Sequence, residues 1–267
     1  MSDNITVGLT SWNEKNQTGP REQREELPKL DFLRLKNGNN VVRILTDPYV
    51  YYHIRYKGPK SRGSFGDRVN TAWPTHADDD GNSLCPAYLN REALTNSKAN
   101  PKKRYFVAVI DRGDNVVKIF DMSVLVYEQL QGILADVKEA TGEDHAPSGF
   151  DINIRYNNKA SSPSGFYHVM GRPPASLSEA DVELIKAVGN DNVSGQEAIT
   201  KILDRQSASP RPESVQRRLE NLGWTEGAEA QGESEGKGNG SGNLEEADDD
   251  DYSFEKPADA PADASVN

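Results

Sequence analysis

Residues 31–73, DFLRLKNGNNVVRILTDPYVYYHIRYKGPKSRGSFGDRVNTAW, contain the pattern that decides the fold. They begin with a strand pattern, and Asn37-Gly38 predicts a two-residue hairpin turn because both residue types tolerate positive φ. The chain is expected to return as a strand over residues 41–45. An aromatic strand, YVYYHIRY, follows over residues 49–56. The stretch therefore predicts consecutive strands joined by short turns.

The aromatic strand is predicted to have two different faces, because side chains alternate along a strand. The first face is largely apolar and is expected to pack on a core; it consists of Val50, Tyr52, Ile54 and Tyr56. The second face is aromatic and basic and is expected to be exposed; it consists of Tyr49, Tyr51, His53 and Arg55.

A basic loop with interleaved aromatic residues follows the strand. Between His53 and Trp73 the sequence has five Lys/Arg residues and one acid. Cations beside flat rings favour a single-stranded nucleic acid, since phosphates meet the cations and unpaired bases stack on the rings. Two plainer interpretations stay open: a Tyr-rich strand commonly forms sheet core, and a Lys/Arg cluster is commonly a solvated surface.

The net charge of −11 is unevenly placed along the 267 residues. Residues 225–267 contain thirteen acids and two lysines, so residues 1–224 are balanced. Residues 28–175 carry 20 basic and 16 acidic residues. A mildly basic body joined to an acidic tail is the asymmetry that indicates a nucleic-acid partner.

Composition and hydrophobic period predict four regions. A hydrophobic content of 35% and a mean hydropathy of −0.76 indicate that parts of the chain cannot bury a core. We expect a flexible N-terminal arm over residues 1–27, an OB-fold-like core over 28–176, a helical segment over 177–224 and a disordered acidic tail over 225–267.

The core is predicted to be mainly β with added helices, an α+β fold built on a small barrel or a strongly curved sheet. Further strands are expected over residues 105–110, 116–121, 150–156 and 165–171, and a short helix near 87–94. A longer helix is expected to begin after Ser123 and to end at Gly142. In the helical segment, helices are expected to begin at Ser178, Ser194 and Pro212.

We expect no cofactor. Cys85 is the only cysteine, so no intramolecular disulfide can form, which fits a reducing cytoplasm. His76 and Cys85 alone do not complete a tetrahedral zinc site. Residues 78–82 suggest a calcium loop, but the twelfth position lacks the required acid. We expect no signal peptide, because residues 1–4 lack a basic start and an apolar run, and no transmembrane helix, because no run of about 18 apolar residues occurs.

Six stretches carry a family resemblance: FLRLKNGNNVVRIL at 32–45, YVYYHIRY at 49–56, KKRYFVAVIDR at 102–112, FDMSVLVYEQLQGI at 120–133, FDINIRY at 150–156 and FYHVMGRPP at 166–174. In order and spacing they resemble the single-stranded DNA-binding, or helix-destabilising, proteins of T-even-like tailed phages. The resemblance covers about residues 28–176, and the acidic tail continues it.

The resemblance implies an OB-fold core that binds single-stranded DNA without sequence preference, in phage DNA replication, recombination and repair. It implies that the tail recruits replication and recombination proteins in the cytoplasm of the infected bacterial host, through Asp248, Asp249, Asp250, Asp251, Tyr252 and Phe254. Two features depart from the best-known member: its zinc ligands are incomplete here, and residues 1–11 lack the Lys/Arg motif used for cooperative binding.

Fifteen cations and rings are candidates for nucleic-acid contact: Arg43, Tyr51, His53, Arg55, Lys57, Lys60, Arg62, Phe65, Arg68, Trp73, Lys102, Lys103, Arg104, Tyr105 and Arg112. Tyr51 is the leading candidate for stacking, followed by Phe65 and Trp73. Residues 102–104 are interpreted as a second wall of the DNA channel, with an edge-strand solubility device as the alternative.

Two other classes of function stay open. A nuclease would use acidic residues to bind a metal, although the usual catalytic motifs are absent from the sequence. An adaptor would bind protein through its core and use the acidic tail as a DNA mimic. Magnesium-dependent degradation of an oligonucleotide would identify the nuclease, and failure to bind single strands at low salt would identify the adaptor.

Overall fold

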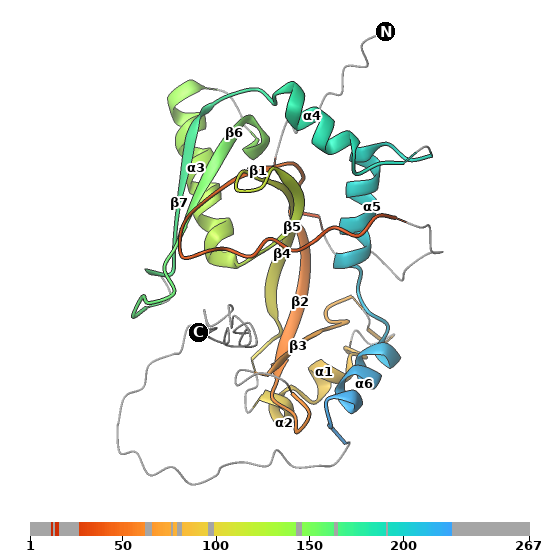
Figure 1. Cartoon of the computed structure of the whole chain (residues 1–267). Coiled ribbons are helices and arrows are strands. Elements are labelled where there is room, and N and C mark those ends of the chain that lie inside the picture. Colours follow the sequence, from red (N-terminus) through yellow and green to blue (C-terminus); the bar gives the residue numbers. More distant parts are fainter. Residues whose placement is uncertain are drawn as a thin grey trace, which may run out of the picture.

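The computed structural model describes residues 12, 14–15, 27–61, 66–75, 77–78, 82–95, 99–142, 146–162, 165–190 and 192–225. The predictions for the tail, including its disorder and residues 248–252 and 254, lie outside these ranges, as do Arg62, Phe65, His76 and most of the N-terminal arm. The described chain is an α+β fold with a mainly antiparallel, seven-stranded sheet that is not closed into a barrel (Figure 1).

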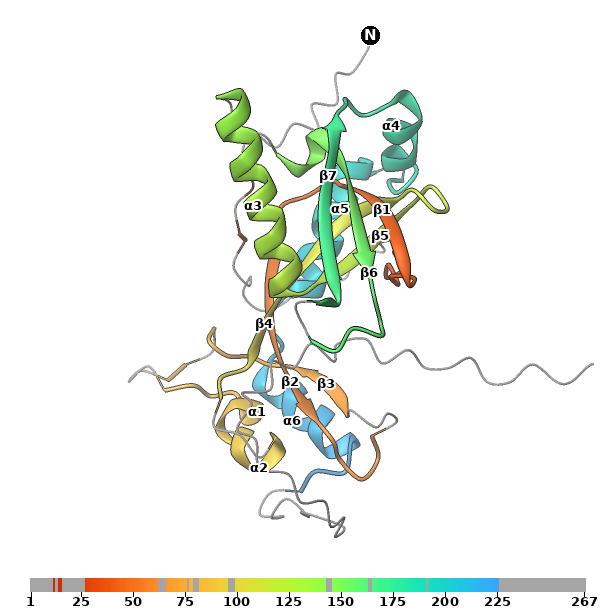
Figure 2. The ribbon, with the colours of Figure 1, turned by 90° about the vertical axis from the view of Figure 1, so that its left-hand side faces the viewer.

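The strands follow one another along the sheet in the order β3-β2-β4-β1-β6-β7, and β5 pairs with β4. Their bounds are β1 Gly38–Ile44, β2 Tyr49–Tyr56, β3 Asp67–Asn70, β4 Lys102–Asp111, β5 Val116–Met122, β6 Phe150–Tyr156 and β7 Tyr167–Pro174. β2 and β1 pair with successive parts of β4, and β5 lies along its other edge. β2 and β4 therefore connect the upper and lower parts of the molecule (Figure 2). Strand β3 was not predicted.

The hairpin predicted at Asn37-Gly38 is wrong. The chain does turn there, with a φ of 100° at Gly38, and the Asn40 side chain hydrogen-bonds both backbone groups of Lys36. The preceding segment does not return along β1, however. Residues 31–33 instead pair in parallel with β5 at Ile119, because Leu33 and Leu35 are buried in the core under the sheet.

The predicted helix starts are confirmed. Helix α3, Val124–Thr141, is capped by Ser123 and ends at Gly142, whose φ of 75° is left-handed. Helices α4 Glu179–Lys186 and α5 Gly195–Ser207 begin after Ser178 and Ser194, and each serine accepts a hydrogen bond from the third helical residue. Helix α6, Pro212–Asn221, begins at the predicted proline, and the short helix near 87–94 is two helices, α1 Pro86–Leu89 and α2 Arg91–Thr95.

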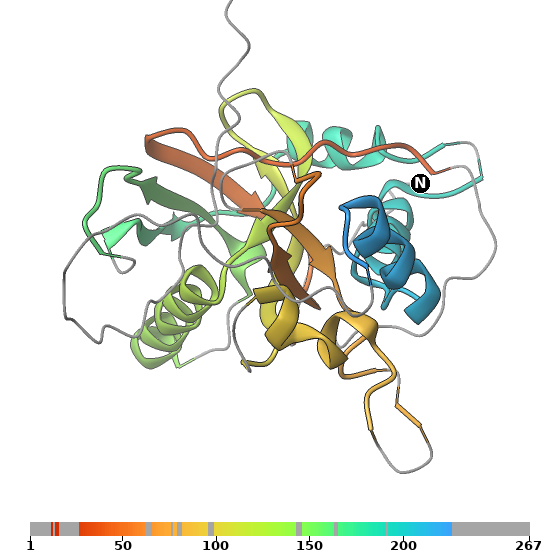
Figure 3. The same cartoon turned by 90° about the horizontal axis from the view of Figure 1, so that it is seen from below.

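Three apolar clusters fill the fold. The first lies between the sheet and α3, and the second lies between the opposite face of the sheet and α4 and α5 (Figure 1). The third gathers α1, α2 and α6 around the end formed by β2 and β3 (Figure 3). The C-terminal helices therefore cover sheet surface that would otherwise be exposed.

This covering overturns the prediction of an exposed second face on β2. Tyr51 and His53 are each only 2% exposed, because α5 packs over the part of that face near Tyr51. The Tyr51 ring stacks on Phe106 with centroids 4.1 Å apart. Sequence alternation correctly separates the two faces but does not show that helices from residues 179–207 cover the second one.

Candidate nucleic-acid interface

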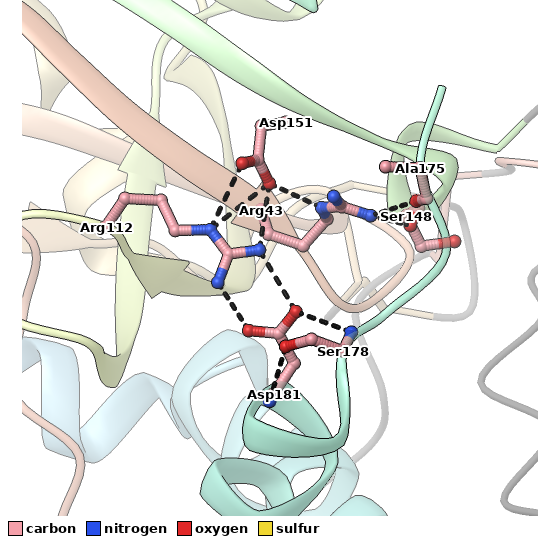
Figure 4. A network of polar contacts seen from close by, with 7 residues as sticks. All are labelled: Arg43, Arg112, Ser148, Asp151, Ala175, Ser178 and Asp181. Carbon is pink, nitrogen blue, oxygen red and sulfur yellow. Dashed lines mark hydrogen bonds and ion pairs between the residues drawn. The ribbon is translucent and has the colours of Figure 1, made fainter. Parts of the chain in front are cut away.

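Two of the candidate arginines belong to an internal ion-pair network (Figure 4). Arg43 on β1 is 3% exposed and donates from Nε to Asp151 at 2.6 Å and from Nη1 to the Ser148 and Ala175 carbonyls. Arg112 donates to Asp151 and also to Asp181, the N3 residue of α4. The network joins β1, β6 and α4, and it orients these guanidinium groups inward.

The carboxylates of this network are held in their ionised form. Hydrogen bonds from Arg112 and from the Ser178 backbone and hydroxyl lower the pKa of Asp181 to about 2. Burial raises the pKa of Asp151, but hydrogen bonds from Arg112 and Arg43 outweigh that effect and lower it below its ordinary value. A structural role therefore accounts for Arg43 and Arg112.

A second internal carboxylate, Asp121 on β5, binds three more candidates. It accepts hydrogen bonds from Arg104 Nε at 2.7 Å and the Tyr51 hydroxyl at 2.7 Å, and it also pairs with Arg68. Burial raises the pKa of Asp121, but the charges of Arg104 and Arg68 outweigh burial and lower it. Arg104 is 4% exposed, so its guanidinium is not at the surface.

His53 lies beside this group as a neutral ring. Burial, together with the positive charges of Arg68 and Arg104, lowers the pKa of His53 to about 2. Its Nδ1 atom is buried and has no hydrogen-bond partner within the described part of the chain. The structure thus brings Tyr51, His53, Arg68 and Arg104 together, but mostly inside the protein.

The remaining candidates differ in accessibility. Lys57, Lys60 and Lys102 are exposed, and Arg55 and Lys103 are half-buried. Tyr105 is buried, and its hydroxyl donates a hydrogen bond to Glu14.

Half-buried aromatic rings form a series at the junction of β2, β3 and α1. Tyr52 meets Trp73 edge to face with centroids 5.0 Å apart, and Trp73 stacks on Tyr88 at 5.6 Å. We call Tyr52, Trp73 and Tyr88 the aromatic cluster. Its rings come from three separate segments, namely β2, the turn after β3, and α1. Each ring is partly accessible, unlike the fully buried Tyr51.

Cations stand at both ends of the aromatic cluster. The Arg91 guanidinium lies over the Tyr88 ring, 4.0 Å from its centroid. At the other end, Lys103 on β4 is the direct cross-strand neighbour of Tyr52. Sequence analysis named Trp73 and Lys103, assigned Tyr52 to the core and missed Tyr88 and Arg91. The spacing of Tyr88 and Arg91, three residues apart in a predicted helix, is the pattern that could have indicated this pair.

A short N-terminal segment lies next to Lys103. Glu14 accepts a hydrogen bond from Lys103 Nζ at 2.5 Å and another from the Tyr105 hydroxyl at 2.8 Å. Lys15 pairs through its backbone with the start of β2, and the buried Trp12 ring lies 5.2 Å from Tyr127. A carboxylate thus occupies one of the two cationic ends of the aromatic cluster.

Cys85 is fully buried among apolar side chains below the aromatic cluster, and its Sγ accepts a hydrogen bond from the Ala72 backbone. Within the described ranges, no three His, Cys, Asp or Glu side chains gather as metal ligands would. Among the same residues, no helix combines the length and hydropathy needed to span a membrane.

Comparison with curated proteins finds a relative from Escherichia phage T5 described as a "Probable ssDNA-binding protein". The alignment is 27% identical over 150 residues, and it covers 49% of this chain and 51% of the relative, so this chain spans about half the length of that relative. No protein-family model matches this chain. No solved structure matches it either.

Proposed function

We propose that this protein binds single-stranded DNA without sequence preference through the aromatic cluster. The observation that carries the proposal is the series Tyr52, Trp73 and Tyr88, whose half-buried rings lie between Lys103 and Arg91. Every base has a π-face, so stacking on such rings tolerates any sequence. The flanking cations are placed to meet the phosphates on either side of a stacked base.

The similarity to the phage T5 protein supports the same function. It supports a phage single-stranded DNA-binding protein in general. The narrower assignment to the T-even-like proteins rests on the sequence motifs alone. We extend the proposal to an OB-fold-like core that acts without catalysis in phage replication, recombination and repair, in the infected host's cytoplasm. The acidic tail would recruit the partner proteins.

Electrostatic attraction contributes to this binding. Lys57 and Lys60 lie on the loop after β2, and Lys102 and Lys103 lie on β4; the first three are exposed and Lys103 is half-buried. If about four cations meet phosphates, a slope near −0.7 per contact gives roughly a 50-fold loss of affinity between 50 and 200 mM salt. A slope near zero would reject the electrostatic component.

Tryptophan fluorescence tests the stacking directly. Trp12 and Trp224 are buried at 8% and 5% exposure, whereas Trp73 is half-buried in the aromatic cluster. Titration with poly(dT) is therefore expected to quench mainly Trp73. The Trp73→Phe variant should lose most of the quench, and the matched control Trp224→Phe should keep it. If Trp73→Phe retains the full quench, the aromatic cluster is not the stacking site.

A further inference from the structure

The sheet has another accessible face, far along the chain from the aromatic cluster. The registers of β1, β6 and β7 align two rows of outward side chains: Asn39, Arg155 and His168 in one row, and Val41, Asn153 and Met170 in the next. Alternate residues point inward to the core beneath α3, which runs along the other side of these strands (Figure 2). With the exposed Arg172 on β7, these residues define the β6–β7 face.

The charge of the β6–β7 face is entirely positive. Residues 150–174 contain Arg155, Lys159 and Arg172 but a single acid, Asp151. That acid is bound by Arg43 and Arg112 in the internal network. β1 contributes no acidic residue. In a chain with a net charge of −11, a face whose one carboxylate is neutralised by two arginines favours a negatively charged ligand.

The second row, formed by Val41, Asn153 and Met170, adds an apolar contact and contains a buried polar atom. Met170 is 39% exposed, and Val41 is half-buried on the other side of Asn153. The Oδ1 atom of Asn153 is buried and accepts no hydrogen bond from the described residues. Because this oxygen is closed off from the surface, the accessible contribution of the row is the apolar contact of Met170 and Val41.

We propose that the β6–β7 face is a second contact surface for the same single-stranded DNA, a statement that rests on the proposed function. A base lies against Met170 and Val41. Arg155 and Arg172 bind phosphates on either side of that base. The ligand is thus a nucleotide unit with both a base and a backbone phosphate, which distinguishes it from a simple anion.

The test removes two positive charges from this face. Arg155→Gln combined with Arg172→Gln is compared with Lys29→Gln combined with Lys186→Gln, two exposed lysines outside both surfaces. Loss of two phosphate contacts is expected to reduce the magnitude of the salt slope for poly(dT) by about 1.4. The control pair should keep the wild-type slope. Met170→Ala should weaken binding without changing the slope, because it removes an apolar contact.

The Trp73 quench separates this inference from the proposed function. A smaller slope with the full Trp73 quench supports the β6–β7 face. A wild-type slope and unchanged affinity in all three variants, again with the full quench, overturns the β6–β7 face and leaves the aromatic cluster in place. Absence of single-strand binding by the wild-type protein overturns both.

Discussion

At the scale of single residues, Glu14 is the side chain that most directly opposes DNA at the aromatic cluster. Burial raises its pKa, but hydrogen bonds from Lys103 and Tyr105 outweigh that effect and lower the pKa below its ordinary value. The carboxylate is therefore ionised at neutral pH and neutralises Lys103, the cation beside Tyr52. A DNA phosphate that approaches Lys103 must compete with this carboxylate.

Glu14→Gln is expected to increase the affinity for poly(dT) at low salt. The amide keeps the shape of the side chain but removes the charge, so Lys103 becomes available to a phosphate. One additional contact should make the salt slope steeper by about 0.7. Fluorescence titrations at several salt concentrations measure both quantities. Glu183→Gln, an exposed acid on α4, is the matched control, and equal slopes for the two variants would contradict the competition.

The residues of the candidate site could be predicted only in part. Trp73 was found because rings and cations alternate along residues 53–73, and Lys103 was found because a basic patch leads into an aromatic strand. Arg43 and Arg112 carry the same chemistry, yet both are bound by Asp151, which lies 108 and 39 residues away. Local sequence shows that a cation is present but not whether folding brings a carboxylate to it. The inward position of Arg43, which is buried, and of Arg112, which is half-buried, follows from that distant partner.

At the scale of elements, features that depend on neighbouring residues could be predicted and features that depend on distant ones could not. Ser123 and Gly142 delimit α3 because caps act within one helical turn. The turn at Gly38 is also local, whereas the partner of the strand before it is not. The second face of β2 is buried by α5, about 150 residues further along the chain, and no alternation within β2 can reveal that.

The contact between Arg112 and Asp181 is expected to make the docking of α4 pH-dependent. Asp181 is 3% exposed, and its folded pKa of about 2 lies below its ordinary value of 3.8. Folding therefore favours the ionised form. The resulting stability, about 2 kcal/mol at 1.36 kcal/mol per pKa unit, is present above the ordinary pKa and is lost as pH falls from about 4 toward 2.

Thermal unfolding between pH 6 and pH 2.5 measures this effect. Asp181→Asn should be less stable than the wild type at pH 6, and the difference should shrink as the pH falls. The control Glu183→Gln lies on the same helix, but its carboxylate is 70% exposed and pairs with Lys186. It should follow the wild-type curve. A constant difference between Asp181→Asn and the wild type across the whole range would show that the ion pair is not the cause.

At the scale of the whole molecule, charge is divided between a balanced body and an acidic tail. Residues 225–267 carry thirteen acids and two lysines, whereas the body presents Lys57, Lys60 and Lys102 at its surface. Because opposite charges on one chain are present at high local concentration, the tail is proposed to compete with DNA for these cations. The acidic run 248–251 with Tyr252 and Phe254 is proposed to bind a replication partner once DNA displaces it.

Deletion of residues 225–267 is therefore expected to tighten single-strand binding. The gain should be largest at low salt and should fade as salt rises, because screening weakens an ionic competitor. A second variant changes Asp248, Asp249, Asp250 and Asp251 to Asn and keeps the length of the tail, so it separates charge from the mere presence of the segment. The deletion leaves residues 27–224 intact, and an unchanged melting temperature would confirm that the body is still folded. If the deleted, neutralised and full-length proteins bind poly(dT) equally well at low salt, the tail does not compete with DNA, and only the proposed binding of partner proteins remains open.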